Sequence, residues 1–237
     1  MQNTRYYEKK NDGIYFSRLP KADQQPGNDG RICRKWEAAG KSGETYGYAV
    51  KEVDGHIESA YVDESEYGIR LCIGLQHPQG VDVVQIKLYK ENGQMTQDGA
   101  GIAKKLANID LDQPICFGTF LATQSSYEIQ GRKITPCYIT LKKPGGQWGI
   151  NYKSIFDYNA ETRSYEGLPG PEVKMVGPKE VKDFSARDAV LFAEIEKFCA
   201  RVDADPNVKA RKAERPQTPA ETAKEESNNL PDDDLDF

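Results

Sequence analysis

The sequence has few of the residues from which metal centres are built. It contains two histidines, His56 and His77, and five cysteines scattered between Cys33 and Cys199 without a C-x-x-C motif. A zinc site would need a tight cluster of such ligands. The cysteines are better explained as buried free thiols of a protein in a reducing compartment. We therefore expect neither a metal nor another cofactor.

Long hydrophobic runs are also absent. No stretch approaches the ~20 apolar residues of a membrane helix, and residues 1–6 lack the apolar core of a signal peptide. Hydrophobic residues make up 38% of the chain and charged residues 29%. These features predict a cytoplasmic protein that has no contact with a membrane.

Catalytic motifs are missing as well. Gly99 and Gly101 lack the strand-to-helix setting of a dinucleotide site, and Asp110 and Asp112 lack the further carboxylates of a nuclease centre. The chain has no phosphate-binding loop, no G-x-S-x-G and no H-E-x-x-H. We therefore expect no catalytic residues, and a protein that is not an enzyme.

Charge is present but unevenly distributed. The formal net charge is -5; residues 221–237 hold one base and seven acids, whereas the preceding 220 residues hold 31 bases and 30 acids. Within that near-neutral body, residues 1–36 and 69–153 are basic. This distribution indicates an anion-binding face and an acidic tail that competes for it.

Composition divides the chain into three parts. Residues 204–237 combine four prolines with polar residues and no apolar periodicity, which predicts a disordered linker and tail. Residues 1–30 form a partly flexible N-terminal segment, since residues 20–30 read as a long loop. The globular domain is expected at residues 31–203.

Alternation of apolar and polar residues is the dominant pattern of that domain. Residues 69–75, 84–88 and 137–141 place every second side chain in a core, as in half-buried strands. Asp54-Gly55 predicts a hairpin turn. Weaker strand signals cover residues 31–38, 44–53, 56–62, 115–122 and 147–155.

Two helices interrupt the strands, at residues 97–108 and 185–202. The second has an apolar stripe of Leu191, Ile195, Phe198 and Val202. A strand meander with one mid-domain helix and a C-terminal helix predicts a mainly β protein. We expect an OB-like antiparallel barrel, with a β-sandwich as the competing architecture.

The chain ends on an aromatic residue after an acidic run. A terminal phenylalanine offers a ring and a carboxylate together, which suits an apolar pocket edged by bases. This tip resembles the tail of bacterial single-stranded DNA-binding proteins, with an aspartate where that family has proline; phage-encoded relatives lack a strict proline. The residues that carry the resemblance are Asp232, Asp233, Asp234, Leu235, Asp236 and Phe237.

The resemblance implies an OB domain that coats single-stranded DNA in replication or recombination, in a phage-infected or bacterial cell. The tail would recruit a polymerase, primase or helicase. A solubilising tail on a structural or adaptor β-protein is the alternative. Sequence-tolerant binding of a single strand needs aromatic platforms and cations. The candidates on outward strand faces are Arg70, Lys87, Tyr89, Tyr138, Lys142, Trp148 and Tyr152; core packing is the alternative for each aromatic.

Overall fold

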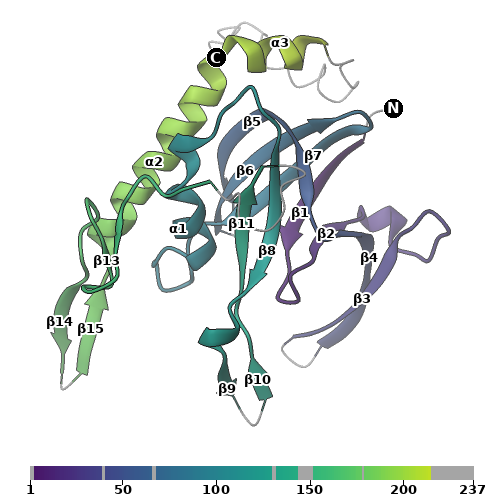
Figure 1. Ribbon diagram of the computed structural model, residues 1–237. Coiled ribbons are helices and arrows are strands. Elements are labelled where there is room, and N and C mark those ends of the chain that lie inside the picture. The colour runs from purple at the N-terminus through teal and green to yellow at the C-terminus, as the bar shows by residue number, and fades with distance from the viewer. Residues whose placement is uncertain are drawn as a thin grey trace, which may run out of the picture.

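The computed structural model of the chain describes residues 3–38, 41–65, 68–129, 132–143, 152–177 and 179–214. The protein is mainly β, as predicted, and is built around a nine-stranded sheet that curls into an open half-barrel (Figure 1). The strand order is β11-β8-β5-β6-β7-β1-β2-β4-β3. The strands are β1 (Asn3–Lys9), β2 (Tyr15–Arg18), β3 (Ile32–Ala38), β4 (Lys41–Val50), β5 (Val53–Ser65), β6 (Gly68–His77), β7 (Gly80–Lys87), β8 (Ile115–Leu121) and β11 (Cys137–Lys142).

Three small hairpins and three helices complete the described part of the fold. The hairpins pair β9 (Tyr127–Ile129) with β10 (Arg132–Ile134), β12 (Tyr158–Asn159) with β13 (Ser164–Tyr165), and β14 (Glu172–Val176) with β15 (Lys179–Asp183). The helices are α1 (Gln97–Ala103), α2 (Ser185–Ala204) and α3 (Pro206–Glu214), and 3-10 turns cover Lys21–Asp23, Leu106–Asn108 and Thr123–Ser125. No described helix is long and apolar enough to cross a membrane.

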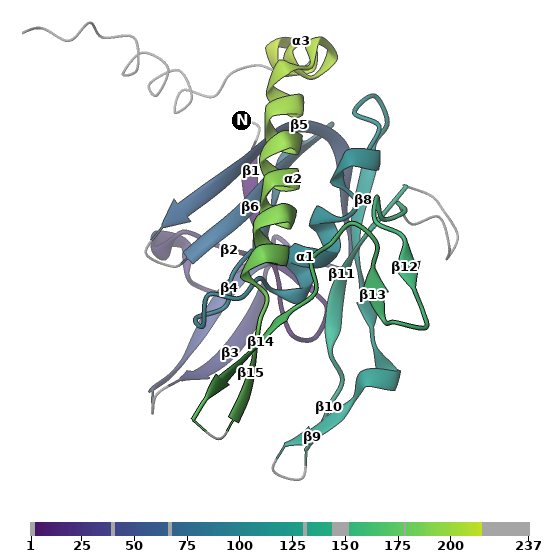
Figure 2. The same ribbon diagram turned by 90° about the vertical axis from the view of Figure 1, so that its left-hand side faces the viewer.

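The core lies on one face of the sheet, and α1 and α2 pack over it (Figure 2). The alternating segments behave as predicted, because their apolar residues are buried or, for Ile69, partly buried against the core. The apolar stripe of α2 is confirmed in the same way: Leu191, Ile195, Phe198 and Val202 are all buried. The strand residues of this core include Leu71, Ile73, Leu75, Val84, Ile86, Ile139 and Leu141.

The expected Asp54-Gly55 turn is wrong, because both residues lie inside β5. The first three residues of β5 pair with β8, and the strand from His56 onward pairs with β6. Gly55 stands where the partner changes, and a Cβ there would lie 2.6 Å from the carbonyl oxygen of Gln76. Glycine is therefore required by a close approach of two backbones rather than by a turn.

The N-terminal segment differs from the expectation too. The parallel pairing of β1 with β7 makes the sheet mixed instead of purely antiparallel. Tyr7 and Tyr15 fill the core with 1% and 0% of their surface exposed. The aromatic residues of these strands are consecutive, Tyr6 with Tyr7 and Tyr15 with Phe16, so alternation could not reveal them. Residues 20–30 do form the long loop that was expected.

Side chains, and not ladder hydrogen bonds, join the two sides of the curled sheet, β1–β2 and β8–β11. Lys9 forms an ion pair with Asp98 at 2.7 Å and donates a hydrogen bond to the Cys137 carbonyl. The other carboxylate oxygen of Asp98 accepts from the backbone N–H of Ile139 at 2.7 Å. The Tyr15 hydroxyl donates to the Gly118 carbonyl at 3.0 Å. These bonds join β1 and β2 to β8 and β11.

The C-terminal end of the described chain is more ordered than predicted. Helix α3 covers residues that were expected to be disordered, and it buries Val208 against the core. Arg211 donates hydrogen bonds to the carbonyls of Ile57 and Leu111, at 3.3 and 2.8 Å. The predicted disorder therefore fails for residues 206–214, and the remainder of that segment, 215–237, lies outside the described residues.

Candidate functional site

Two exposed tyrosines stand on the outer face of the sheet, which is the face opposite the core. Tyr6 on β1 is 49% exposed and Tyr61 on β5 is 41% exposed. Between their strands lies a small buried cluster of Cys72, Val81 and Val83. Burial raises the pKa of Tyr61, and the nearby Cys72 and Tyr6 add to the effect. Its hydroxyl therefore stays neutral at physiological pH, and the exposed part of the ring can stack on a base.

A groove of about 770 Å³ opens on the outer face beside Tyr6, where the sheet turns from β1 into the wing. The wing is the hairpin of β3 and β4, which projects from the body (Figure 1). Five bases and one acid line the groove, so its potential is positive. The lining residues are Tyr6, Glu8, Lys9, Lys10, Asn11, Phe16, Arg18, Arg34, Lys35, Thr45 and Gln85.

Arg34 covers the buried ring of Phe16 at one side of this groove. The guanidinium carbon of Arg34 lies 5.5 Å from the centre of the Phe16 ring, and Arg34 also forms an ion pair with Asp12 at 2.8 Å. Burial alone would raise the pKa of Asp12, but the hydrogen bond from Arg34 holds that pKa below its usual value. Gly47 underlies the ring, because a Cβ there would lie 2.6 Å from Phe16.

Two groove bases have no counter-ion in the part of the chain that the structure describes. Arg18 and Lys35 are both exposed, and neither forms an ion pair with another described residue. Lys10, in contrast, pairs with Glu8, and Lys9 pairs with Asp98. Uncompensated bases beside the exposed ring of Tyr6 favour an anion that also carries flat rings.

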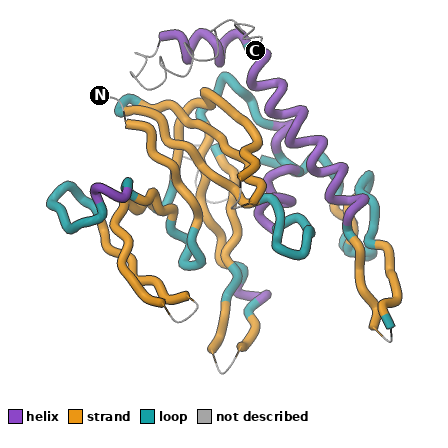
Figure 3. The backbone as a smooth tube through the Cα atoms, turned by 180° about the vertical axis from the view of Figure 1, so that it is seen from behind, coloured by secondary structure: helices purple, strands orange, loops and turns teal. Residues whose placement is uncertain are grey.

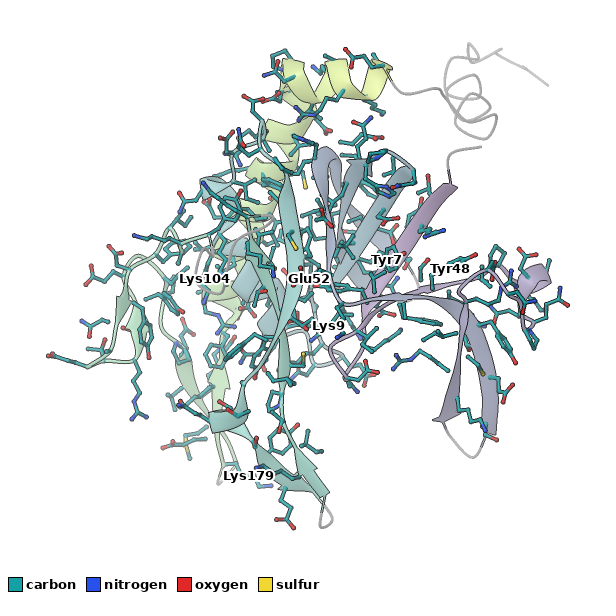
Figure 4. All side chains as sticks on the ribbon, turned by 45° about the vertical axis from the view of Figure 1, so that its right-hand side comes forward. Tyr7, Lys9, Tyr48, Glu52, Lys104 and Lys179 are labelled. Carbon is teal, nitrogen blue, oxygen red and sulfur yellow. The ribbon has the colours of Figure 1, made fainter. Side chains whose placement is uncertain are left out.

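The rear of the wing is fixed by the long loop before β3. The Gln24 side chain accepts a hydrogen bond from the Tyr46 N–H at 2.7 Å and donates to the Tyr46 carbonyl at 3.0 Å, which continues the ladder where β2 ends. The Tyr48 hydroxyl donates to Asp29 at 2.8 Å, and its ring lies under the Arg5 guanidinium (Figure 4). These contacts hold the groove's far wall in place.

Arg70 and Lys87 lie together on the outer face, where the sequence placed them. They are direct partners in the register of β6 and β7, and Asp63 of β5 is the other neighbour of Arg70. Like charges directly opposite each other destabilise a strand pair. A phosphate bridging Arg70 and Lys87 would remove that cost.

Tyr138 and Lys142 face outward as well, but on a different part of the molecule. Both lie on β11, at the other end of the strand order from the wing, and Tyr138 is opposite the 46%-exposed Phe120. Lys142 is bound to Glu52 at 2.5 Å. That hydrogen bond raises the pKa of Lys142 and leaves less of its charge for a ligand. Neither residue lines the groove.

Two predicted stacking residues belong to the core instead. Tyr89 packs against the core, and its ring centre is 6.1 Å from that of Phe192 on α2. Alternation in the sequence predicted that Tyr89 faces solvent, but helix α2 lies over it. Tyr152 is 7% exposed, and its backbone N–H donates to the Leu141 carbonyl at 3.2 Å. Trp148 and the tip residues 232–237 lie outside the described residues.

No family model, curated protein or solved structure matches the chain. What the site can bind is therefore inferred from its own residues. The described residues contain no group of three histidine, cysteine or acidic side chains that could hold a metal ion. What they do contain is a curved surface with two exposed tyrosines, a basic groove and one close pair of cations.

The sequence analysis missed Tyr6, Tyr61 and the groove bases. A β-bulge between Ile57 and Ser59 shifts the alternation of β5 by one residue. The core residues on either side of the bulge are Ile57 and Ala60, so Tyr61 turns outward. In the sequence, the alternation of Ala60, Tyr61 and Val62 was the pattern that could have predicted the outward orientation of Tyr61.

Proposed function

We propose that the protein binds single-stranded DNA across the outer face of its sheet. The observation that carries the proposal is the combination of exposed Tyr6 and Tyr61 with the basic groove beside Tyr6. Bases stack on aromatic rings while cations follow the phosphates, and this mode of binding needs no particular sequence. A path from β3 to β5 crosses seven strands, or about 29 Å at the usual strand spacing of about 4.8 Å.

The proposal includes a modified OB barrel. Its support is the order of elements: a β5-β6-β7 meander, then α1, then β8 returning to β5 and pairing with β11. In OB folds, nucleic acid binds on the second and third strands and on the loop between the fourth and fifth. The corresponding elements are β6 and β7, which carry Arg70 and Lys87, and the β9–β10 hairpin. Here β1 occupies the parallel position beside β7.

A titration with labelled oligo-dT and with a duplex of equal length tests this function directly. The exposed rings can stack only on unpaired bases, so the single strand binds more tightly than the duplex. Absence of binding to both would leave the structural or adaptor protein as the better description.

Salt dependence tests the groove separately. Log affinity for a single strand falls with log salt by about 0.7 for each phosphate neutralised. We expect Arg18→Ala/Lys35→Ala, which removes the two groove bases without an ion-pair partner among the described residues, to reduce the steepness of that slope by about 1.4, as two contacts require. Lys197→Ala/Lys212→Ala, which removes two exposed helical bases, is the control and keeps the wild-type slope. Equal slopes for both variants would remove the groove from the DNA path.

The resemblance of the tip supports a second role, the recruitment of a replication protein. Deleting residues 221–237 removes a net charge of -6 and should tighten DNA binding, most strongly at low salt, because a tethered polyanion no longer competes. Phe237→Ala removes no charge. It should keep the affinity for DNA and lose pull-down of a polymerase, primase or helicase. Weaker DNA binding after the deletion would mean that the tail does not compete.

A further inference from the structure

The hairpin of β14 and β15 projects from the body near the foot of α2 (Figures 1 and 3). It is a two-stranded sheet of its own, separate from the main sheet. Three of its apolar side chains are open to solvent: Val173 is 57%, Met175 63% and Val181 44% exposed. An isolated two-stranded hairpin is at best marginally stable in water. A third strand would supply the missing contacts.

The charge sequence of β15 is complementary to itself. The strand reads Lys179, Glu180, Val181, Lys182, Asp183. When it is laid antiparallel on a copy of itself about Val181, Glu180 faces the copy's Lys182 and Lys179 faces the copy's Asp183. Every charged position then meets the opposite sign, and Val181 meets its own equivalent. Opposite charges and apolar pairs directly across a strand pair are both stabilising.

The β14–β15 hairpin, called the arm from here on, does not use the charges nearest the centre of this arrangement. Across the hairpin, Glu180 faces Met175 and Lys182 faces Val173. Neither forms an ion pair with another described residue, whereas Lys174 pairs with Asp183 at 2.5 Å. The pairing with a copy would therefore give the side-chain charges of Glu180 and Lys182 opposite partners without breaking the Lys174–Asp183 bond. The Lys182 carbonyl, which accepts from the Gln94 side chain at 3.3 Å, would then accept from the backbone of the copy.

The free edge of β14 is less suited to the same contact. Two β14 strands paired antiparallel about Lys174 would place two lysines face to face. Paired about Val173, they would match Glu172 with Lys174 but set Met175 against Pro171, which cannot donate a hydrogen bond to the ladder. The two edges of the arm thus differ, and β15 is the complementary one.

We propose that β15 pairs antiparallel with β15 of a second copy of this chain, about a two-fold axis at Val181. The product is a four-stranded sheet in the order β14-β15-β15-β14. It has three strand pairs where each free arm has one, and the two Val181 side chains meet at its centre. The contact is isologous, so it closes at a dimer. A five-residue strand buries little area, which makes the dimer dependent on concentration.

Charge reversal tests the register. Glu180→Lys turns both central pairs of the dimer into lysine against lysine, and Lys182→Glu turns them into glutamate against glutamate. In sedimentation measurements over a concentration series, the wild type rises from the 26.6 kDa of one chain towards twice that mass. Each single variant loses association by about tenfold or more, since two attractive pairs become repulsive.

Recovery separates this register from general charge effects. An equimolar mixture of the Glu180→Lys and Lys182→Glu chains forms a heterodimer, because all four central charges are then matched, and Glu180→Lys/Lys182→Glu pairs with itself. The control is Glu128→Lys and Lys133→Glu on the β9–β10 hairpin, a facing pair whose reversal leaves association unchanged. A wild type that stays at one chain's mass, or single variants that associate normally, would overturn the proposal.

A disulfide probe gives an independent readout. In a Cys33→Ser background, which removes the exposed thiol, oxidation of Val181→Cys should link two chains through the residue on the axis. Val173→Cys, on the same arm and equally open, should not link, because its equivalents lie apart in this register. Linking at residue 173 but not at 181 would place the contact on β14 and contradict the proposal.

Discussion

Replacing Tyr6 and Tyr61 together by alanine is expected to weaken single-strand binding by about 2–6 kcal/mol, because each ring that stacks on a base contributes about 1–3 kcal/mol. The lower figure corresponds to a roughly 30-fold rise in the dissociation constant. Fluorescence anisotropy with oligo-dT measures this change. Both side chains are more than 40% exposed, so the variant should fold, and a thermal melt checks that it does.

Tyr158→Ala is the matched control for this pair. Tyr158 is 56% exposed and lies on the β12–β13 hairpin, away from the groove, so its loss should leave affinity unchanged. A folded Tyr6→Ala/Tyr61→Ala variant with wild-type affinity would show that DNA does not cross the outer face. A similar loss in the control would indicate indirect effects of tyrosine removal.

Asp98→Ala should lower the free energy of unfolding by about 2–4 kcal/mol, the largest stability effect that we expect. It leaves the Lys9 ammonium without its carboxylate, and it leaves the Ile139 N–H without an acceptor. Because Lys9 and Asp98 keep 14% and 18% exposure, the cost falls below that of a fully buried pair. Urea denaturation followed by circular dichroism measures it.

A surface ion pair provides the comparison. Lys197, 71% exposed, pairs with Glu194 on α2 at 2.7 Å, and Lys197→Ala should cost less than about 1 kcal/mol. Adding Lys9→Met to Asp98→Ala should recover part of the loss by removing the stranded charge. If Asp98→Ala costs no more than Lys197→Ala, the side-chain bridge does not hold β1–β2 and β8–β11 together.

The periodic segments of the sequence predicted their structure correctly. Alternation places every second residue on one side of a strand regardless of the rest of the fold. The buried faces of β6, β7 and β11 could therefore be read from residues 69–75, 84–88 and 137–141. The stripe of α2 was readable for the same reason, since a long amphipathic helix needs no information about its partner.

Features that depend on distant partners could not be read in this way. The alternation of apolar and polar residues predicts that Tyr89 points outward, but Phe192 of α2 covers it. Asp54-Gly55 has the composition of a turn, yet its surroundings are the backbone of Gln76. The groove unites residues of β1, β2, β3, β4 and β7, and no local pattern reports which strands become neighbours.

The parallel pairing of β1 with β7 has a consequence for the order of events during synthesis. Residues 3–8 pair with residues 80–85, so β1 leaves the ribosome long before its partner exists. The wing can pair with β2 in the meantime, because all three strands have then been made. Closing so long a loop slows folding, and the unpaired edge of β1 is exposed to aggregation meanwhile. Rare codons between β2 and β7 should therefore reduce the yield of folded protein more than the same codons placed after β11.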